Sequence, residues 1–246
     1  MSEQQEGSTI NHTNSIFTFR DDDFVLYNQV QVCSTIPKNV LLLSGIPGLS
    51  SEYFLPLAHM LQLPTNVWRV DLPDNGNNLK RKFKNFDGWF NLFLETIQRF
   101  DRPILISHSF GGMIPLMLPQ TEKLLSGIIL LNTASSLPKN PDFEIKSFLD
   151  GYAFNQKAAL WFQKKIIETN YKAQWIPQTL PTLILGAKKD TIVPFNPFRK
   201  DSLFQRENIT IKTVPNSGHF CWLDNPLFVR KMVYSFLSDL FELEGF

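Results

Sequence analysis

Short apolar runs alternate with helix-like segments along most of the chain, and no other feature constrains the fold as strongly. The runs are rich in Val, Ile and Leu, and several are continuous enough for strands buried on both faces. This alternation predicts an α/β fold whose mostly parallel sheet is covered by helices on both faces. The predicted strands are residues 40–45, 67–71, 103–108, 127–132, 182–187 and 209–214, and the predicted helices are 51–61, 87–100, 110–119 and 226–243.

The N-terminal region differs from this pattern. Residues 16–19 and 24–32 are expected to pair as antiparallel strands at a sheet edge, because the sequence RDDD between them favours a turn. Residues 1–15 are polar and lack the basic and apolar regions of a signal peptide, so we expect a flexible tail. No apolar run approaches the roughly 18 residues of a membrane-spanning helix. We therefore expect a cytoplasmic protein.

One long segment interrupts the alternation. Residues 137–178 contain helix-like runs with many aromatic residues but no strand-like run, and we interpret them as a helical lid. The lid would be inserted into a core of residues 16–136 and 179–246. A pair of ordinary helices packed on the sheet is the alternative. The candidate substrate-binding residues are Phe143, Phe148, Tyr152, Trp161 and Trp222.

Composition narrows the class of protein. A chain of 246 residues suits one α/β domain with a modest insertion. Its 24 Lys and Arg against 23 Asp and Glu argue against a dedicated nucleic-acid binder, which needs a clear basic excess. Two cysteines are too few for a disulfide framework, and no Cys/His spacing resembles a zinc site.

Ser109 is the candidate nucleophile. It lies at the junction of a predicted strand and a predicted helix, where a sharp turn requires small neighbours two residues away on each side. Ser107 and Gly111 meet that requirement. Ligands of open parallel sheets bind outside the carboxyl ends of the strands, and the following helix N-terminus favours negative charge. An ordinary tight turn is the alternative, since Ser and Gly dominate turns.

A serine nucleophile needs a base, and the base needs an orienting carboxylate. His219 follows the last predicted strand, and Asp190 follows the strand before it, so both are expected at the same sheet edge as Ser109. His108 is also near, but its side chain is expected to point away from the serine. A structural loop histidine and a surface aspartate are the alternatives when each residue is taken alone.

Backbone donors for an oxyanion are expected in the sequence SGIPG, residues 44–48, which follows the first buried strand. The glycines allow a backbone N–H to turn toward the site. The N–H groups of Ile46 and Phe110 are the predicted pair. A Gly/Pro turn without a chemical role is the alternative.

At these residues the chain resembles the α/β-hydrolase family, and specifically its small esterase-like members. The resemblance extends over residues 16–243 and implies the fold and a Ser-His-Asp triad. Ser44 stands where the family usually has His, Ser107 where it has Gly, and Asp74 where it often has Gly. The motifs that carry it are SHSFGG (107–112), LSGIPG (43–48), VDLPDNGNN (70–78), GAKKDTIVP (186–194) and SGHFCWLDNP (217–226).

The resemblance implies hydrolysis of an ester by two-step acyl transfer, with no cofactor and no metal. A thioesterase, a C–C bond hydrolase, an acyltransferase or a perhydrolase would use the same residues. A non-catalytic binding protein on this fold is the rival from another class, although it would be expected to lack a triad member. An epoxide hydrolase or dehalogenase would need Asp at position 109.

Lysines suggest one possible substrate. Residues 137–178 contain six lysines and four acidic residues, and the sequence KRKFK occupies residues 80–84. We hypothesise a short-to-medium acyl ester carried by acyl carrier protein, as in the pimeloyl-carrier methyl ester esterases of biotin biosynthesis, which the chain also resembles. The alternative is that these lysines only solvate the surface.

Overall fold

A seven-stranded sheet forms the centre of the molecule. The computed structural model describes residues 26–31, 38–45, 49–61, 65–72, 75, 78, 86–135, 157, 160–161, 164, 168, 177–193, 195, 198 and 201–241. Among these residues the strand order is β1-β3-β2-β4-β5-β6-β7. The strands are β1 (Leu26–Gln31), β2 (Asn39–Leu43), β3 (Asn66–Asp71), β4 (Ile104–His108), β5 (Gly127–Leu131), β6 (Thr182–Ala187) and β7 (Ile209–Val214).

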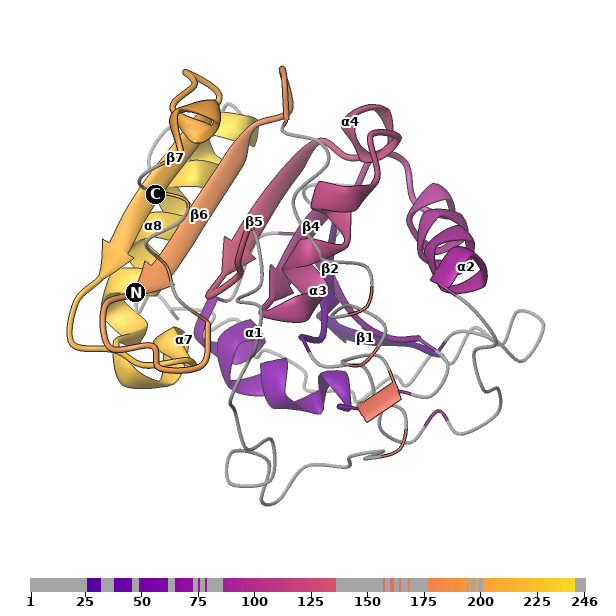
Figure 1. Ribbon diagram of the computed structural model, residues 1–246, viewed down its shortest axis with the longest axis horizontal. Coiled ribbons are helices and arrows are strands. Elements are labelled where there is room, and N and C mark those ends of the chain that lie inside the picture. The colour runs from indigo at the N-terminus through magenta and orange to yellow at the C-terminus, as the bar shows by residue number, and fades with distance from the viewer. Residues whose placement is uncertain are drawn as a thin grey trace, which may run out of the picture.

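The sheet is mostly parallel, as predicted. Only β1 runs antiparallel to its neighbour, β3, and every other described pair of strands is parallel. All residues of β4, β5 and β6 are buried, which explains their continuous apolar sequences. The arrowheads of β4 to β7 point to the same lower edge in Figure 1, where the candidate catalytic residues follow their strands. The predicted strand 16–19 lies outside the described residues.

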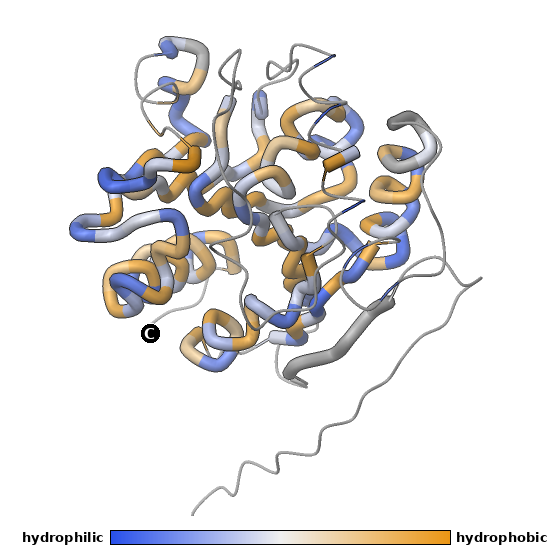
Figure 2. The backbone as a smooth tube through the Cα atoms, turned by 60° about the horizontal axis from the view of Figure 1, so that its bottom comes forward, coloured by the Kyte–Doolittle hydropathy of each residue, from blue (hydrophilic) through white to orange (hydrophobic). Residues whose placement is uncertain are grey.

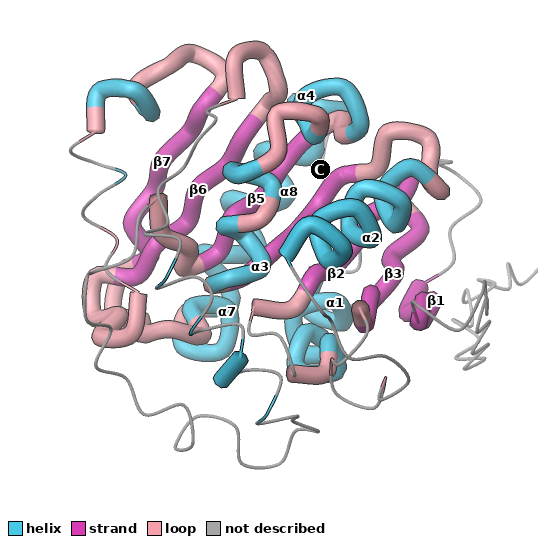
Figure 3. Tube along the Cα trace, turned by 45° about the vertical axis from the view of Figure 1, so that its right-hand side comes forward, coloured by secondary structure: helices cyan, strands magenta, loops and turns pink. Residues whose placement is uncertain are grey.

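Helices cover both faces of the sheet. On one face lie α1 (Leu55–Leu61), α7 (Cys221–Asp224) and α8 (Pro226–Phe241), and on the other lie α2 (Phe86–Gln98), α3 (Phe110–Met113) and α4 (Thr121–Leu124) (Figures 1 and 3). Alternate strand residues face the two layers: Leu41 and Leu43 join one hydrophobic cluster, whereas Val40 and Leu42 join the other. The predicted α/β architecture is confirmed.

The closing helix shows how the layers are held. Along α8, Val229, Val233 and Leu237 are buried at intervals of four residues, so one face of the helix packs on the sheet. Figure 2 shows hydrophobic and hydrophilic residues alternating along its turns. Full burial of such a side chain contributes about 1.5–3 kcal/mol.

Three predicted helices differ in detail. The helix predicted over residues 51–61 is a 3₁₀ turn over Ser51–Phe54 followed by α1. The helix predicted from Asp87 begins one residue earlier, at Phe86, so Asp87 lies within its first turn. The helix predicted over residues 110–119 is instead two short pieces, α3 and a 3₁₀ turn over Pro115–Met117. Pro115 has no backbone N–H and its ring crowds the preceding turn, which explains why the α-helix ends before it.

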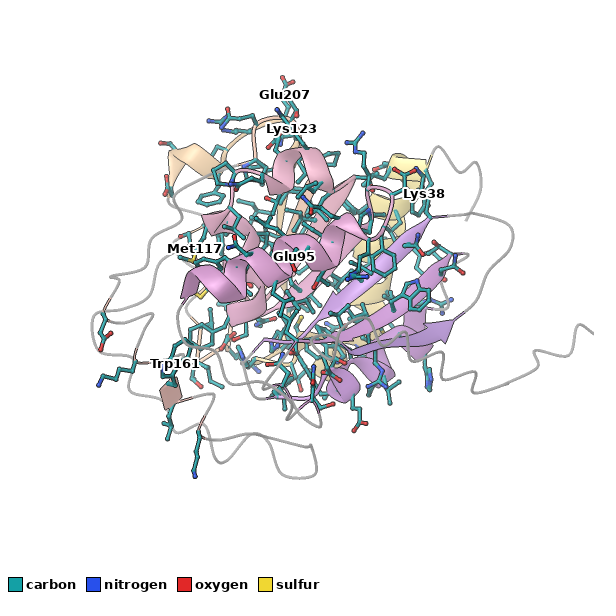
Figure 4. The ribbon with its side chains drawn as sticks, turned by 90° about the vertical axis from the view of Figure 1, so that its right-hand side faces the viewer. Lys38, Glu95, Met117, Lys123, Trp161 and Glu207 are labelled. Atoms are coloured by element: carbon teal, nitrogen blue, oxygen red, sulfur yellow. The ribbon has the colours of Figure 1, made fainter. Side chains whose placement is uncertain are left out.

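The predicted lid lies largely outside the described residues. Within it, residues 157, 160, 161, 164 and 168 are helical. Trp161 packs against the same hydrophobic cluster as Met117, and both are labelled in Figure 4. Its bounds, and those of the tail, stay predictions. In the described part of the chain, no helix has the length and apolar character that crossing a membrane requires.

Candidate active site

Ser109 occupies a strained turn between β4 and α3. Its φ of 52° and ψ of −124° belong to a region that residues with a side chain rarely adopt, and such a conformation costs about 1–3 kcal/mol. Hydrogen bonds to the backbone of Ser109 stabilise this conformation. The Ser109 N–H donates to the Leu131 carbonyl over 3.0 Å, and the Ser109 carbonyl accepts from Thr133 Oγ1 at 2.7 Å and from the Gly112 N–H at 3.1 Å.

Small residues allow the neighbouring chain to approach this turn. A Cβ atom at Gly111 would lie 2.3 Å from the Ser44 carbonyl oxygen, and one at Gly45 would lie 2.8 Å from Ser109 Cβ. Both distances are far shorter than van der Waals contact. Ser107, two residues before the nucleophile, is completely buried. The requirement for small residues around Ser109 therefore has a direct steric cause.

Asp190 follows β6 and has hydrogen-bond donors on both carboxylate oxygens. Oδ1 accepts from the N–H groups of Ile192 and Val193, each at 2.9 Å. Oδ2 accepts from Asn132 Nδ2 at 2.7 Å and from His219 Nδ1 at 2.9 Å. Burial alone would raise the pKa of Asp190, but the hydrogen bonds and the charge of His219 outweigh it and lower that pKa. The side chain is therefore a carboxylate at neutral pH.

His219 lies in the loop between β7 and α7. Because Asp190 accepts the proton of Nδ1, the opposite ring nitrogen, Nε2, is the one that can exchange a proton with a nucleophile. The residue is 8% exposed. Its loop is anchored at Gly218, whose carbonyl accepts from Asn132 Nδ2 at 3.2 Å and whose N–H donates to Asp224 Oδ2 at 2.7 Å.

The three predicted triad residues are brought to one edge of the sheet, with one hydrogen bond formed. His219 and Asp190 are joined, whereas Ser109 Oγ is buried and has no hydrogen-bond partner in the described part of the chain. A hydrogen bond between the serine and histidine often shortens only when substrate is bound. The arrangement is that of a base already oriented by its acid, with the serine at the end of β4 on the same edge of the sheet.

The predicted oxyanion donors are described only in part. Phe110 is the first residue of α3 and directly follows Ser109, whereas Ile46 lies outside the described residues. The preceding N–H, that of Gly45, donates to Tyr53 Oη at 2.8 Å. Ser44, which replaces the usual histidine, accepts a hydrogen bond from Asn75 Nδ2 at 3.0 Å. A polar contact thus braces the loop at this position.

The predicted substrate-binding residues have different placements. Phe143, Phe148 and Tyr152 lie outside the described residues, and Trp161 is half-buried. Trp222 is 2% exposed and its ring stacks on Phe54 with centroids 5.4 Å apart. That position places Trp222 in the core behind the histidine loop, which favours packing over contact with substrate.

Sequence reasoning missed Asn132. This residue directly follows β5, has a φ of 46°, and contacts both Asp190 and the histidine loop. The rule that site residues follow parallel strands could have identified it, because Ser109, Asp190 and His219 were predicted in the same way. Among the described residues, no group of three or more His, Cys, Asp or Glu is placed to hold a metal ion.

The sequence matches a protein-family model over more than half of its length. Residues 40–180 match the model described as "Alpha/beta hydrolase family". The matched range includes Ser109 and ends before Asp190 and His219. The sequence has no match among curated proteins.

Solved structures share the architecture at low sequence identity. A proline iminopeptidase-related protein from Thermus thermophilus is 17% identical, with a TM-score of 0.69 over 88% of this chain and 94% of that one. A serine hydrolase involved in carbazole degradation is 17% identical, with a TM-score of 0.67 over 87% and 94% of the two chains. A monoacylglycerol lipase from Paleococcus ferrophilus is 17% identical, with a TM-score of 0.61 over 87% and 98%. These likenesses concern the fold.

Proposed function

Because the chain belongs to the alpha/beta hydrolase family, we propose that it is a serine hydrolase that cleaves carboxylic esters through an acyl-enzyme on Ser109. The observation that carries this proposal is the hydrogen bond of 2.9 Å between His219 Nδ1 and the ionised Asp190. It leaves Nε2 of His219 to act on the strained serine, which follows β4 at the same edge of the sheet. A serine, an oriented base and a carboxylate together suit acyl transfer.

The reaction begins when His219 Nε2 takes the proton of Ser109 and Oγ bonds to the ester carbonyl carbon. Asp190 stabilises the imidazolium that results. The N–H groups of Phe110 and Ile46 donate to the oxyanion. Collapse of the tetrahedral intermediate breaks the bond to the leaving alcohol, which takes the proton from His219. Water then attacks the acyl-enzyme in the same way, releases the acid and restores Ser109.

Variants of the proposed nucleophile test this function. Ser109→Ala should lose about 10³-fold or more in kcat on esters of graded acyl length, with little change in melting temperature. Thr133→Ser is a matched control, because it keeps the hydroxyl that donates to the Ser109 carbonyl. Wild-type turnover by Ser109→Ala, with Thr133→Ser unaffected, would refute the serine mechanism. Parallel thioester and ester substrates would separate an esterase from a thioesterase.

An ester of a short-to-medium acyl chain on acyl carrier protein, such as a pimeloyl methyl ester, is the finer part of the proposal. Its support is the lysine content of residues 80–84 and 137–178, of which Lys157 and Lys164 are described and exposed. Reversing charge at Lys80, Arg81 and Lys82 should slow turnover of a carrier-bound ester in a salt-dependent manner and spare a small free ester. Equal effects on both substrates would contradict recognition of a carrier.

A further inference from the structure

We propose that Tyr53 and His108 are positioning residues that couple the oxyanion loop to the catalytic histidine through a chain of buried hydrogen bonds. This inference rests on the proposed function, because it holds that the two residues keep the oxyanion loop and His219 in position for that reaction. Neither side chain takes part in the acyl-transfer steps described above. We call this set of contacts the Tyr53–His108 relay.

The relay is continuous. The Gly45 N–H lies 2.8 Å from Tyr53 Oη, and Tyr53 Oη lies 3.1 Å from His108 Nδ1. His108 Nε2 lies 3.0 Å from the backbone carbonyl oxygen of His219. Tyr53 is 1% exposed and His108 is 2% exposed, so the path does not pass through solvent. It starts in the oxyanion loop, passes through His108, the residue before the proposed nucleophile, and ends on the backbone of the proposed base.

The partners fix the direction of every hydrogen bond. The His219 carbonyl can only accept, so His108 Nε2 must carry a proton and donate it. A neutral imidazole has one N–H, so Nδ1 accepts from the Tyr53 hydroxyl. The Tyr53 oxygen in turn accepts from Gly45, whose N–H can only donate. A single tautomer of His108 therefore satisfies all three contacts.

Burial keeps His108 in the neutral form that the relay needs. Desolvation is the main cause that lowers the pKa of His108 well below its usual value, and the charge of His219 lowers it further. The ring is enclosed by aromatic residues: Trp222 packs edge to face at a centroid distance of 4.9 Å, and Tyr53 lies 5.6 Å away. Trp222, expected from the sequence to contact substrate, thus packs against the relay.

The ends of the relay lie where small displacements affect the reaction. Gly45 precedes Ile46, a proposed oxyanion donor, and its Cα hydrogen faces Ser109, since an added Cβ would meet Ser109 Cβ at 2.8 Å. His219 supplies the proposed base. A misplacement of about 1 Å in such groups reduces the rate by about 100-fold. Loss of the relay should therefore reduce the chemical step more than substrate binding.

Tyr53→Phe removes only the hydroxyl and keeps the ring that stacks on Phe54 with centroids 4.5 Å apart. We expect kcat for p-nitrophenyl butyrate to fall by about 10- to 100-fold, with KM changed by less than about threefold. The rate of labelling by a fluorophosphonate, which also needs the oxyanion donors and the base, should fall by a similar factor. A defect in substrate binding alone would raise KM and would not give this combination of results.

Tyr234→Phe is the matched control. Tyr234 donates a hydrogen bond to the Leu61 carbonyl between α8 and α1, away from the nucleophile turn. Its loss should lower the melting temperature and leave kcat within about twofold of wild type. If Tyr53→Phe behaves like Tyr234→Phe, with stability lowered and kcat kept, the relay is structural only and the inference is wrong.

A second pair of variants tests whether the two residues act as one path. His108→Asn breaks the next contact, and the double variant with Tyr53→Phe should be no slower than His108→Asn alone, because either change interrupts the same relay. Additive losses in the double variant would contradict coupling. If the wild-type protein hydrolyses no ester and resists the fluorophosphonate, the proposed function fails and the relay fails with it. If the wild-type protein is active and Tyr53→Phe keeps that activity, the relay is refuted and the proposed function stands.

Discussion

The nucleophile turn and the histidine loop each bring a histidine to the site, and the two rings have opposite hydrogen-bonding patterns. His108 has a partner on both ring nitrogens, the Tyr53 hydroxyl and the His219 carbonyl. His219 has a carboxylate on Nδ1, and in the described part of the chain no hydrogen bond is formed to its Nε2. The two ring centroids are only 4.5 Å apart.

This difference indicates that hydrogen-bond partners, and not proximity to Ser109 in the sequence, decide which histidine can act as a base. His108 is the residue next to Ser109, yet both of its nitrogens are engaged, and burial lowers its pKa. A ring in that state can neither accept a proton from a nucleophile nor keep a charge. His219 is distant in sequence, but its hydrogen bond to Asp190 fixes one tautomer and leaves Nε2 as the nitrogen that can accept a proton.

The largest expected effect is the difference in kcat between the same substitution made at each of the two histidines. His219→Asn removes the proposed base, and we expect kcat to fall by about 10³-fold or more with little change in stability. His108→Asn should reduce kcat far less, by about 10- to 100-fold. It should also lower the free energy of unfolding by about 1–3 kcal/mol, because buried polar groups lose partners. Activity assays and urea unfolding measure both; equal losses of kcat would contradict the division of roles.

Asn132 offers a smaller and more specific change on the histidine-loop side. Asn132→Gly removes the amide that donates to Asp190 and to the Gly218 carbonyl, while glycine tolerates the φ of 46°. We expect kcat to fall by about tenfold, because the acid and the loop lose a shared anchor.

Asn216 provides the control for this substitution. It also has a positive φ, of 52°, and is exposed, so Asn216→Gly introduces the same backbone freedom without touching Asp190. Its kcat should match that of wild type. A similar loss of kcat in both variants would assign the effect to backbone freedom and not to the amide contacts of Asn132.

Two carboxylates near strand ends should make the stability of the protein depend on pH in opposite directions. Asp190 has a lowered pKa, so its contribution to stability is present above about pH 4 and is lost as pH falls further. Asp71, at the end of β3, has the opposite shift: burial raises its pKa to about 6, against a hydrogen bond from the Ser51 N–H that lowers it. The folded state then holds an extra proton between about pH 4 and 6, so stability falls as pH rises through that range.

Asparagine substitutions should remove these two opposite dependences. Asp71→Asn should abolish a decrease of about 2–3 kcal/mol in the free energy of unfolding between pH 4 and 7. Asp190→Asn should instead flatten the decrease below pH 4, and it should also reduce kcat by about 100-fold or more because the imidazole loses its orienting acid. Urea unfolding at stepped pH values measures both slopes. Slopes of the same sign would show that one of the two shifts is wrong.

Much of the fold could be predicted because the strands are short and continuously apolar. Six predicted strands are found within two residues of their predicted ends, and β1 is found within its predicted range. The break at Pro115 was not predicted, because a proline near a helix start is tolerated and only the local packing shows that the helix stops. The bounds of the lid and tail remain predictions.

The placement of the candidate residues could be predicted where they follow strand ends: Ser109 comes directly after β4, and Asp190 and His219 lie in the loops after β6 and β7. The Tyr53–His108 relay could not, because its contacts join residues 55 and 111 positions apart, and these residues meet only through tertiary packing. The packing of Trp222 could not be predicted for the same reason, since an aromatic residue near the histidine loop can face substrate or the core. No sequence pattern distinguishes these orientations.

Ser109 is tested most directly by mass spectrometry of the protein after reaction with a fluorophosphonate, with the modified residue located by peptide mapping. We expect one adduct, on Ser109, that is absent from Ser109→Ala and forms about 10³-fold more slowly in His219→Ala. An adduct on another residue, or undiminished labelling of Ser109→Ala, would contradict the claim that Ser109 is the nucleophile of a His219–Asp190 triad.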